Sequence, residues 1–306
     1  MEKDPTLHTK SMDKQLEKLI VKAFKDLSPL PQHSYLVIID GLDECHDKAI
    51  QQLILQLLCK TITVHKLPLR FLIGSRPESH IRAIFDQESL YTITHRVVLD
   101  ETFNPGRDIR VFLQDGFAKI SADNPIISHV EHPWPSEGII DLLVQRSSGQ
   151  FIYASTVLKF VHADFCSPTE QLALVLKPDP TAFSDLDQLY TQILSVYPSA
   201  VNIVQILGFI IASQQDLPEV IEDILGMEEG KLKLVLRGLS SLMNEEKIND
   251  RKAISYVIPH FAHASFSDYL FDSCRSGPFY VNRPEYENQV TIRSYALIFQ
   301  LIRSWR

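Results

Sequence analysis

The spacing of apolar residues alternates between helical and strand-like in the first hundred positions. Residues 11–27 place leucine, isoleucine and phenylalanine every three or four positions, which predicts an amphipathic helix with Ser11 as its N-cap. The run YLVIID at 35–40 is continuous and apolar, as in a strand buried on both faces of a parallel sheet. The same criteria predict a helix over 47–64, a buried strand over 69–74, a helix over 79–85 and a third strand, THRVVLDE, over 94–101. This alternation predicts a parallel α/β sheet.

The strand-like spacing stops near residue 104. Helices are predicted over 106–120, 136–147, 149–163 and 168–176, and the proline-rich segment 177–183 marks a boundary. Beyond it, residues 216–271 predict helix, helix, a short strand pair and helix, an order that suits a winged helix. We therefore expect an α/β fold followed by an all-α part, divided into 1–103, 104–182, 183–275 and a connector, 276–306, to a further C-terminal region.

Composition and charge narrow the class of protein. Hydrophobic residues make up 45% of the 306-residue chain and charged residues 22%, which is typical of a globular protein. The net charge of -8 and the pI near 5.8 argue against nucleic acid or an anionic membrane as partner. The four cysteines form neither a disulfide framework nor paired zinc ligands, and the longest apolar stretch, 203–212, is too short to span a bilayer. We expect a cytoplasmic protein.

Three carboxylates follow the first predicted strand in the phrase LVIIDGLDEC. Ligands of α/β proteins bind at the carboxyl edge of the sheet, so Asp40 is the candidate ligand of Mg²⁺, acting directly or through water. Asp43 and Glu44 would orient or deprotonate a water that attacks a γ-phosphate. The alternative is an acidic turn that caps the helix starting near Asp47, and an isolated strand-end aspartate would favour it. The full DGLDE context favours the catalytic interpretation.

Arg76 follows the second predicted strand, in RFLIGSRPESHIR. A guanidinium at the same sheet edge as Asp40 can reach a γ-phosphate, because its planar donors match phosphate oxygens. The alternative is an ordinary ion pair with a surface carboxylate. On spacing alone the two are equally supported, and pairing with the first motif favours the phosphate role.

Together, LVIIDGLDEC and RFLIGSRPESHIR resemble the Walker B and sensor 1 elements of NACHT-type (STAND) nucleoside triphosphatases, in particular the fungal group with a nephrocystin-3-like N-terminal region. SMDKQLEKLIVKAF resembles the helix that precedes Walker B in the same proteins. RSSGQFIYASTVLKFV resembles their helical domain, DLDQLYTQILS the entry to the winged helix, and FAHASFSDYLFD the last helix of the winged helix. The resemblance implies a signalling switch that uses Mg²⁺ with ATP or GTP. It implies that 1–103 is the C-terminal part of the nucleotide-binding domain, followed by a helical domain and a winged-helix domain.

In that family a histidine of the winged-helix phrase contacts the β-phosphate of bound ADP. The resemblance carries this role to His263. Taken alone, a histidine among Phe261, Ala262, Ala264 and Phe266 is more simply a helix-start or core residue.

Two departures from the family pattern limit the functional prediction. No GxxxxGK[ST] string occurs in the 306 residues, so the loop that holds the phosphates, and the core strand that carries it, are absent from the sequence. The glycine phrase of the helical domain reads Gly149, Gln150, Phe151 and lacks the proline expected near the adenine.

Nucleotide binding and hydrolysis should therefore be weak or lost, and whether the chain acts as an enzyme stays undecided. The alternative is a non-catalytic interaction scaffold or a degraded remnant, whose partners are proteins or further N- and C-terminal domains. A winged-helix DNA binder is disfavoured, because FSDYLFD is acidic.

Overall fold

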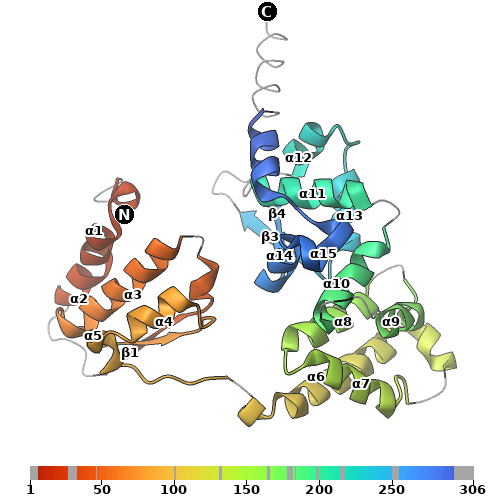
Figure 1. Ribbon diagram of the computed structural model, residues 1–306, viewed down its shortest axis with the longest axis horizontal. Helices are drawn as coiled ribbons and strands as arrows, with labels where there is room; N and C mark the ends of the chain where they lie inside the picture. Colours follow the sequence, from red (N-terminus) through yellow and green to blue (C-terminus); the bar gives the residue numbers. More distant parts are fainter. Residues whose placement is uncertain are drawn as a thin grey trace, which may run out of the picture. The chain divides into compact units, whose positions relative to one another are not determined.

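The chain forms two units, Met1–Val98 and Leu99–Arg306, and each is described by itself. The computed structural model describes residues 6–26, 33–45, 47–99, 101–130, 133–163, 166–177, 182, 184–197, 200–213, 218–249 and 255–292. Figure 1 shows a small sheet with helices in the first unit and a mostly helical second unit. The end of the predicted first helix at residue 27 and the tail beyond residue 292 lie outside the described residues.

The sheet of the first unit is a parallel pair. Strand β1 (Tyr35–Ile39) pairs with β2 (Leu69–Ile73) in register from Tyr35 opposite Leu69 to Ile39 opposite Ile73. Helix α3 (Lys48–Thr63) connects the two strands, as a parallel connection requires. Both strands and this helix confirm the sequence prediction.

Short helices form two small cores in this unit. The helical segment predicted over 11–27 is α1 (Met12–Leu16), the π-helical η2 (Glu17–Val21) and α2 (Lys22–Lys25), preceded by η1 (Leu7–Thr9). Its Val21 packs with Leu67 and Leu69. Helices α4 (Ser79–Phe85) and α5 (Glu88–Tyr91) pack against α3 around a second cluster: Leu42, Leu55, Cys59, Ile81, Ile84 and Leu90.

One face of the sheet is uncovered. Leu36 is 61% exposed, Ile38 64% and Leu72 58%, and the register places Ile38 beside Leu72. Leu69, on the other face of β2, is buried. The prediction that β1 is buried on both faces is therefore wrong for this chain, and Tyr35 and Val37 on its other face are also 42% and 37% exposed. The predicted burial of β2 holds on one face only, because Arg70 and Leu72 are exposed.

No strand forms over the described part, residues 94–99, of the predicted third strand. Residues 94–99 are described without strand structure, and Val97, Val98 and Leu99 are exposed. A β-branched run favours extended backbone, yet a strand also needs a neighbour to satisfy its amides and carbonyls. Among the described residues this segment has no such neighbour.

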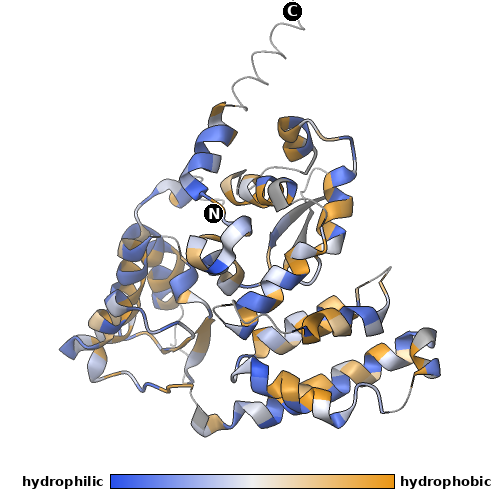
Figure 2. Cartoon of the chain, turned by 45° about the vertical axis from the view of Figure 1, so that its right-hand side comes forward, coloured by the Kyte–Doolittle hydropathy of each residue, from blue (hydrophilic) through white to orange (hydrophobic). Residues whose placement is uncertain are grey.

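The first helices of the second unit pack against one another. Helices α6 (Pro105–Asp123), α7 (Glu137–Ser147), α8 (Phe151–Val161) and α9 (Pro168–Leu176) confirm the four predicted helices. Each carries an apolar and a polar side (Figure 2). The apolar sides meet in a core that contains Leu113, Phe117, Leu143 and Val157.

The remaining elements continue the same core. They are α10 (Asp185–Ser195), α11 (Ala200–Ser213), α12 (Pro218–Leu225), α13 (Lys231–Gly238), β3 (Met243–Asn249), β4 (Ser255–Phe261), α14 (Ala264–Leu270), α15 (Ser273–Ser276) and a helix over 283–292. Strands β3 and β4 are antiparallel, which confirms the predicted order of helix, helix, strand pair and helix. The boundary at 182/183 falls inside this unit, and it stays a prediction, as do the assignments of 1–103 to part of a P-loop NTPase sheet and of 183–275 to a winged helix.

Candidate functional site

The loop that follows β1 is anchored at the carboxyl end of both strands. The amide of Leu42 donates to the carbonyl of Gly74 at 3.1 Å, and the amide of Gly74 donates to the carbonyl of Ile39 at 2.8 Å. Gly41 has φ +65, a left-handed conformation that a side chain would strain, and it turns the chain so that Leu42 enters the core. The short turn η3 (Leu42–Glu44) then carries the two acidic residues.

The structure brings Asp43 and Arg76 together. Asp43 Oδ1 accepts a hydrogen bond from the backbone N–H of Arg76 at 2.9 Å and from Ser75 Oγ at 3.2 Å. The Arg76 Nε atom lies 3.5 Å from Asp43 Oδ2. The Asp43 side chain is 10% exposed, whereas that of Arg76 is 41% exposed. The two sequence motifs are thus joined by the carboxylate of one and the backbone and guanidinium of the other.

Asp40 and Glu44 lie in the same loop without sharing these contacts. A Cβ atom added at Gly74 would lie 2.6 Å from Asp40 Oδ1, so the Asp40 carboxylate lies against the glycine at the end of β2. Glu44 is exposed, and its side chain packs over Gly41. Among the described residues, no group of three or more His, Cys, Asp or Glu side chains lies close enough together to hold a metal ion.

The alternative readings of both motifs can be compared with these contacts. Helix α3 is capped by Asp47, whose Oδ1 accepts from the amide of Ala49 at 2.7 Å, so Asp40, Asp43 and Glu44 are not the side chains that cap it. The alternative role of Arg76 was an ion pair with a surface carboxylate. Arg76 does pair with a carboxylate, but this is Asp43 of the DGLDE motif. The catalytic roles of these four residues stay predictions.

The sequence analysis did not predict a set of hydrogen bonds that Gln51 makes to the acidic loop. Gln51, on α3, donates from Nε2 to the carbonyl of Asp43 at 3.0 Å and to that of Cys45, while its Oε1 contacts His80 Nε2. Gln51 is buried although it is polar, and His80 stands on α4, just after the Arg76 loop. Gln51 therefore connects the loop that carries Asp43 to α4, the helix that follows the Arg76 loop. A polar residue at a core-facing position of a helical pattern is the one signal that could have indicated it.

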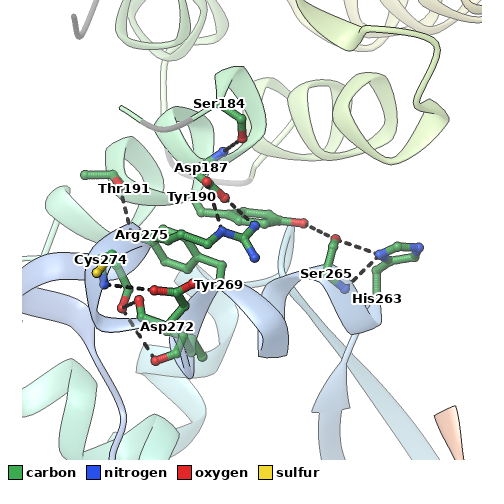
Figure 3. A network of polar contacts seen from close by, with 12 residues as sticks. Ser184, Asp187, Tyr190, Thr191, His263, Ser265, Tyr269, Asp272, Cys274 and Arg275 are labelled. Carbon is green, nitrogen blue, oxygen red and sulfur yellow. Dashed lines mark hydrogen bonds and ion pairs between the residues drawn. The ribbon is translucent and has the colours of Figure 1, made fainter. Parts of the chain in front are cut away.

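His263 is the first residue of a polar network in the second unit (Figure 3). It is the N-cap of α14, and its Nδ1 accepts from the amide of Ser265 at 3.1 Å. The same Nδ1 lies 2.7 Å from Ser265 Oγ, which lies 2.8 Å from the hydroxyl of Tyr190 on α10. The simpler reading of His263 as a helix-start residue thus describes its local structure, and its phosphate contact stays a prediction.

Two further polar contacts join α10 to the segment around α14 and α15. Arg275 donates from Nη2 to Asp187 Oδ1 at 2.7 Å and from Nε to Oδ2 at 3.1 Å, a bidentate pair in which the Asp187 side chain is 1% exposed. The hydrogen bond with Asp187 raises the pKa of Arg275. The hydroxyls of Thr191 and Tyr269 lie 2.8 Å apart. Asp187, Thr191 and Tyr269 lie in phrases that carry the family resemblance, but the sequence analysis assigned them no contact, and Arg275 lies outside those phrases.

Comparison with known protein families gives a match at the beginning of the chain. Residues 1–76 match the family model described as Nephrocystin 3, N-terminal. No curated protein and no solved structure matches the chain. The first 76 residues thus resemble a nephrocystin-3-like N-terminal region. The matched segment contains Asp40, Asp43, Glu44 and Arg76 and ends at the last of them.

The residues at the strand ends fit one part of a magnesium–nucleotide site. Asp40 offers an exposed carboxylate at a strand end, the hard oxygen ligand that Mg²⁺ prefers, and Arg76 offers donors to a phosphate. The amides and lysine that would hold the other phosphate oxygens have no counterpart in the sequence.

Among the described residues, no helix is both long and apolar enough to cross a membrane.

Proposed function

We propose that the chain is part of a NACHT-type signalling nucleoside triphosphatase of the fungal kind, a conformational switch that uses Mg²⁺ with ATP or GTP. The observation that carries the proposal is the contact between Asp43 and Arg76. Two motifs separated by more than thirty residues meet at the carboxyl ends of adjacent parallel strands, where α/β proteins bind ligands. The match of residues 1–76 to a nephrocystin-3-like region supports the same assignment.

The contacts of Asp40, Asp43 and Glu44 indicate a different role for each. Asp40 is exposed beside Gly74 and would hold Mg²⁺ through oxygen. Asp43 is bonded to Ser75 and Arg76, so its first role is to fix the distance between the two loops. Glu44 is exposed and is the better placed of the two to orient a water. Bound Mg²⁺ would supply charge neutralisation on the phosphates.

Nucleotide affinity should be low, because the P-loop supplies most of the phosphate donors in such sites and the sequence has none. The test is Mg²⁺-dependent binding of a fluorescent ADP or ATP analogue to the purified chain. We expect weak binding that Asp40→Ala removes. Gly74→Ala should mimic it, because the new Cβ displaces the Asp40 carboxylate while leaving its charge in place.

A matched control separates these effects from loss of surface charge. Asp13→Ala removes an exposed carboxylate of the same unit, which bonds Lys60 at 3.1 Å, and should leave nucleotide binding unchanged. Absence of binding at millimolar nucleotide would reject the switch for this chain, and binding that survives Asp40→Ala would reject the magnesium assignment.

The uncovered sheet face favours a second candidate function, a non-catalytic scaffold derived from such a protein. Leu36, Ile38 and Leu72 form an apolar patch of the kind that marks interaction surfaces. Micromolar, Mg²⁺-dependent binding of nucleotide that Asp40→Ala abolishes would reject this candidate.

A further inference from the structure

Gln51 holds the acidic loop from the helix that follows it. Its Nε2 donates to the carbonyl of Asp43 at 3.0 Å and to the carbonyl of Cys45. Glu44 lies between these two residues, so its main chain is held on both sides while its side chain stays exposed. Gln51 itself is 4% exposed and lies near the start of α3. A buried amide that bonds two loop carbonyls fixes the path of the main chain between them.

The direction of each hydrogen bond follows from the two carbonyls. A carbonyl can only accept, so the end of the Gln51 amide that faces Asp43 and Cys45 is its NH₂ group. The other end is Oε1, which also can only accept, so His80 Nε2 must carry a proton and donate to it. His80 Nδ1 is buried and has no hydrogen-bond partner among the described residues. Within that part of the chain, the imidazole is therefore held by its bond to Gln51.

His80 connects this arrangement to the helix that follows Arg76. It lies at the start of α4, which packs against α3, and Figure 1 shows the two helices side by side. The backbone carbonyl of His80 also accepts from Gln52 Nε2 at 3.5 Å. A displacement of the start of α4 would withdraw the donor from Gln51 Oε1 and leave that buried oxygen without its partner, which is costly.

We propose that Gln51 is a positioning residue for the acidic loop and that His80 makes the position of this loop depend on α4. Gln51 fixes the main chain around Glu44, and His80 fixes the amide of Gln51. A shift of α4 then releases the loop, and by reciprocity an ordered loop holds α4 in place. The consequence for a ligand rests on the proposed function, in which Asp40 holds Mg²⁺ and Glu44 orients a water.

Hydrogen exchange of the loop amides measures this positioning without any ligand. The amides of Leu42 and Glu44 donate within the strand-end loops, so their exchange in the full chain reports local opening. Gln51→Met removes both donors and retains an unbranched side chain at the buried position. We expect exchange of both loop amides to become about tenfold faster, because two hydrogen bonds are lost. The amide of Leu57, in the middle of α3, should keep its wild-type rate.

Matched variants separate positioning from folding. Gln56→Met makes the same change at an exposed position of the same helix, and it should leave the loop amides at wild-type rates. Gln51→Glu retains the shape of the side chain but places a carboxylate against two carbonyls, so it should speed loop exchange more than Gln51→Met does. Loop amides that keep wild-type rates in Gln51→Met would overturn the proposal. So would an equal acceleration at Leu57, because the first unit would then be opening as a whole.

His80→Phe tests the dependence on α4. It retains an aromatic ring and removes the donor to Gln51 Oε1. We expect the loop amides to exchange several-fold faster, though less so than in Gln51→Met, because the bonds from Gln51 to the two carbonyls can still form. Combining His80→Phe with Gln51→Met should add little to Gln51→Met alone. Additive effects would show that His80 acts on the loop by another route, which would overturn its assigned role.

Nucleotide binding tests the consequence for the proposed site. If the wild-type chain binds an ADP analogue in the presence of Mg²⁺, Gln51→Met should weaken that binding several-fold and Gln56→Met should not. Unchanged affinity in Gln51→Met, with loop exchange accelerated, would overturn the role of Gln51 in the site. A wild-type chain that binds no nucleotide rejects the proposed function, and the exchange rates then decide by themselves whether Gln51 and His80 position the loop.

Discussion

The carboxylate of Asp43 accepts a hydrogen bond from the backbone N–H of Arg76 at 2.9 Å, and this contact fixes one motif loop to the other. The bond does not depend on the arginine side chain, because its donor is the main chain. It makes Asp43 a structural residue of the strand-end loops before any ligand is present. The same carboxylate cannot move freely to a second task without releasing Ser75 and Arg76.

Asp43→Ala should destabilise the first unit by about 1–2 kcal/mol, because it leaves the Ser75 hydroxyl and the Arg76 amide without this acceptor. The ion pair adds little, since the arginine side chain is 41% exposed. Urea unfolding followed by circular dichroism measures the change. Glu44→Ala, at an exposed neighbouring position, is the control and should stay within about 0.5 kcal/mol of wild type. Equal stability of the two variants would show that the Asp43 contacts are not maintained in solution.

The strand-end site was predictable from sequence because its parts are local. An apolar run followed by DGLDE or GSRP specifies a strand and the residues at its end, and parallel pairing then brings the ends together. The sequence could mark Gln51 as a polar residue at a core-facing helix position, but not its contact with His80, since that contact depends on how α3 and α4 pack. The prediction of a third strand was wrong because it rested on local propensity alone. Val97 and Val98 favour extended backbone but have no neighbouring strand among the described residues. Local pattern predicts elements, whereas neighbours decide which of them form.

Arg275→Ala should be among the most destabilising single changes in the second unit. It leaves the Asp187 carboxylate, 1% exposed, without its bidentate partner, and breaking such a pair costs about 3 kcal/mol. Asp187→Leu combined with Arg275→Met should recover most of the loss, because it removes both charges and retains packing. The free energy of unfolding of the single and double variants measures this coupling. Additive losses in the double variant would contradict a desolvated pair.

Alkaline pH should unfold the second unit. Burial raises the pKa of Tyr153, Tyr190, Tyr197 and Tyr269 to about 12, from an unfolded value near 10. The folded state therefore retains protons that the unfolded state loses, so this contribution is complete below about pH 10 and declines as the pH rises to about 12. Unfolding free energies and tyrosinate absorbance over this range measure the decline. In Tyr190→Phe combined with Tyr269→Phe the slope should be shallower, and an unchanged slope would assign the loss to other groups.

Lysine on the uncovered face of the sheet should reduce self-association without unfolding the chain. Ile38 is 64% exposed and Leu72 58%, so Ile38→Lys and Leu72→Lys should change stability by less than about 0.5 kcal/mol. Leu69→Lys, on the covered face of the same strand pair, is the control, and it should unfold the first unit because it buries a charge among Val21 and Leu67.

The two faces can be compared by sedimentation velocity over a range of protein concentrations. The wild-type chain should sediment faster as concentration rises, because contiguous exposed apolar residues on a strand pair attract another apolar surface. Ile38→Lys and Leu72→Lys should remove that dependence while retaining the helical circular dichroism of wild type. If they unfold the chain as Leu69→Lys does, then Leu36, Ile38 and Leu72 are covered in solution. The sheet would then have both faces buried, as continuous apolar strands normally require.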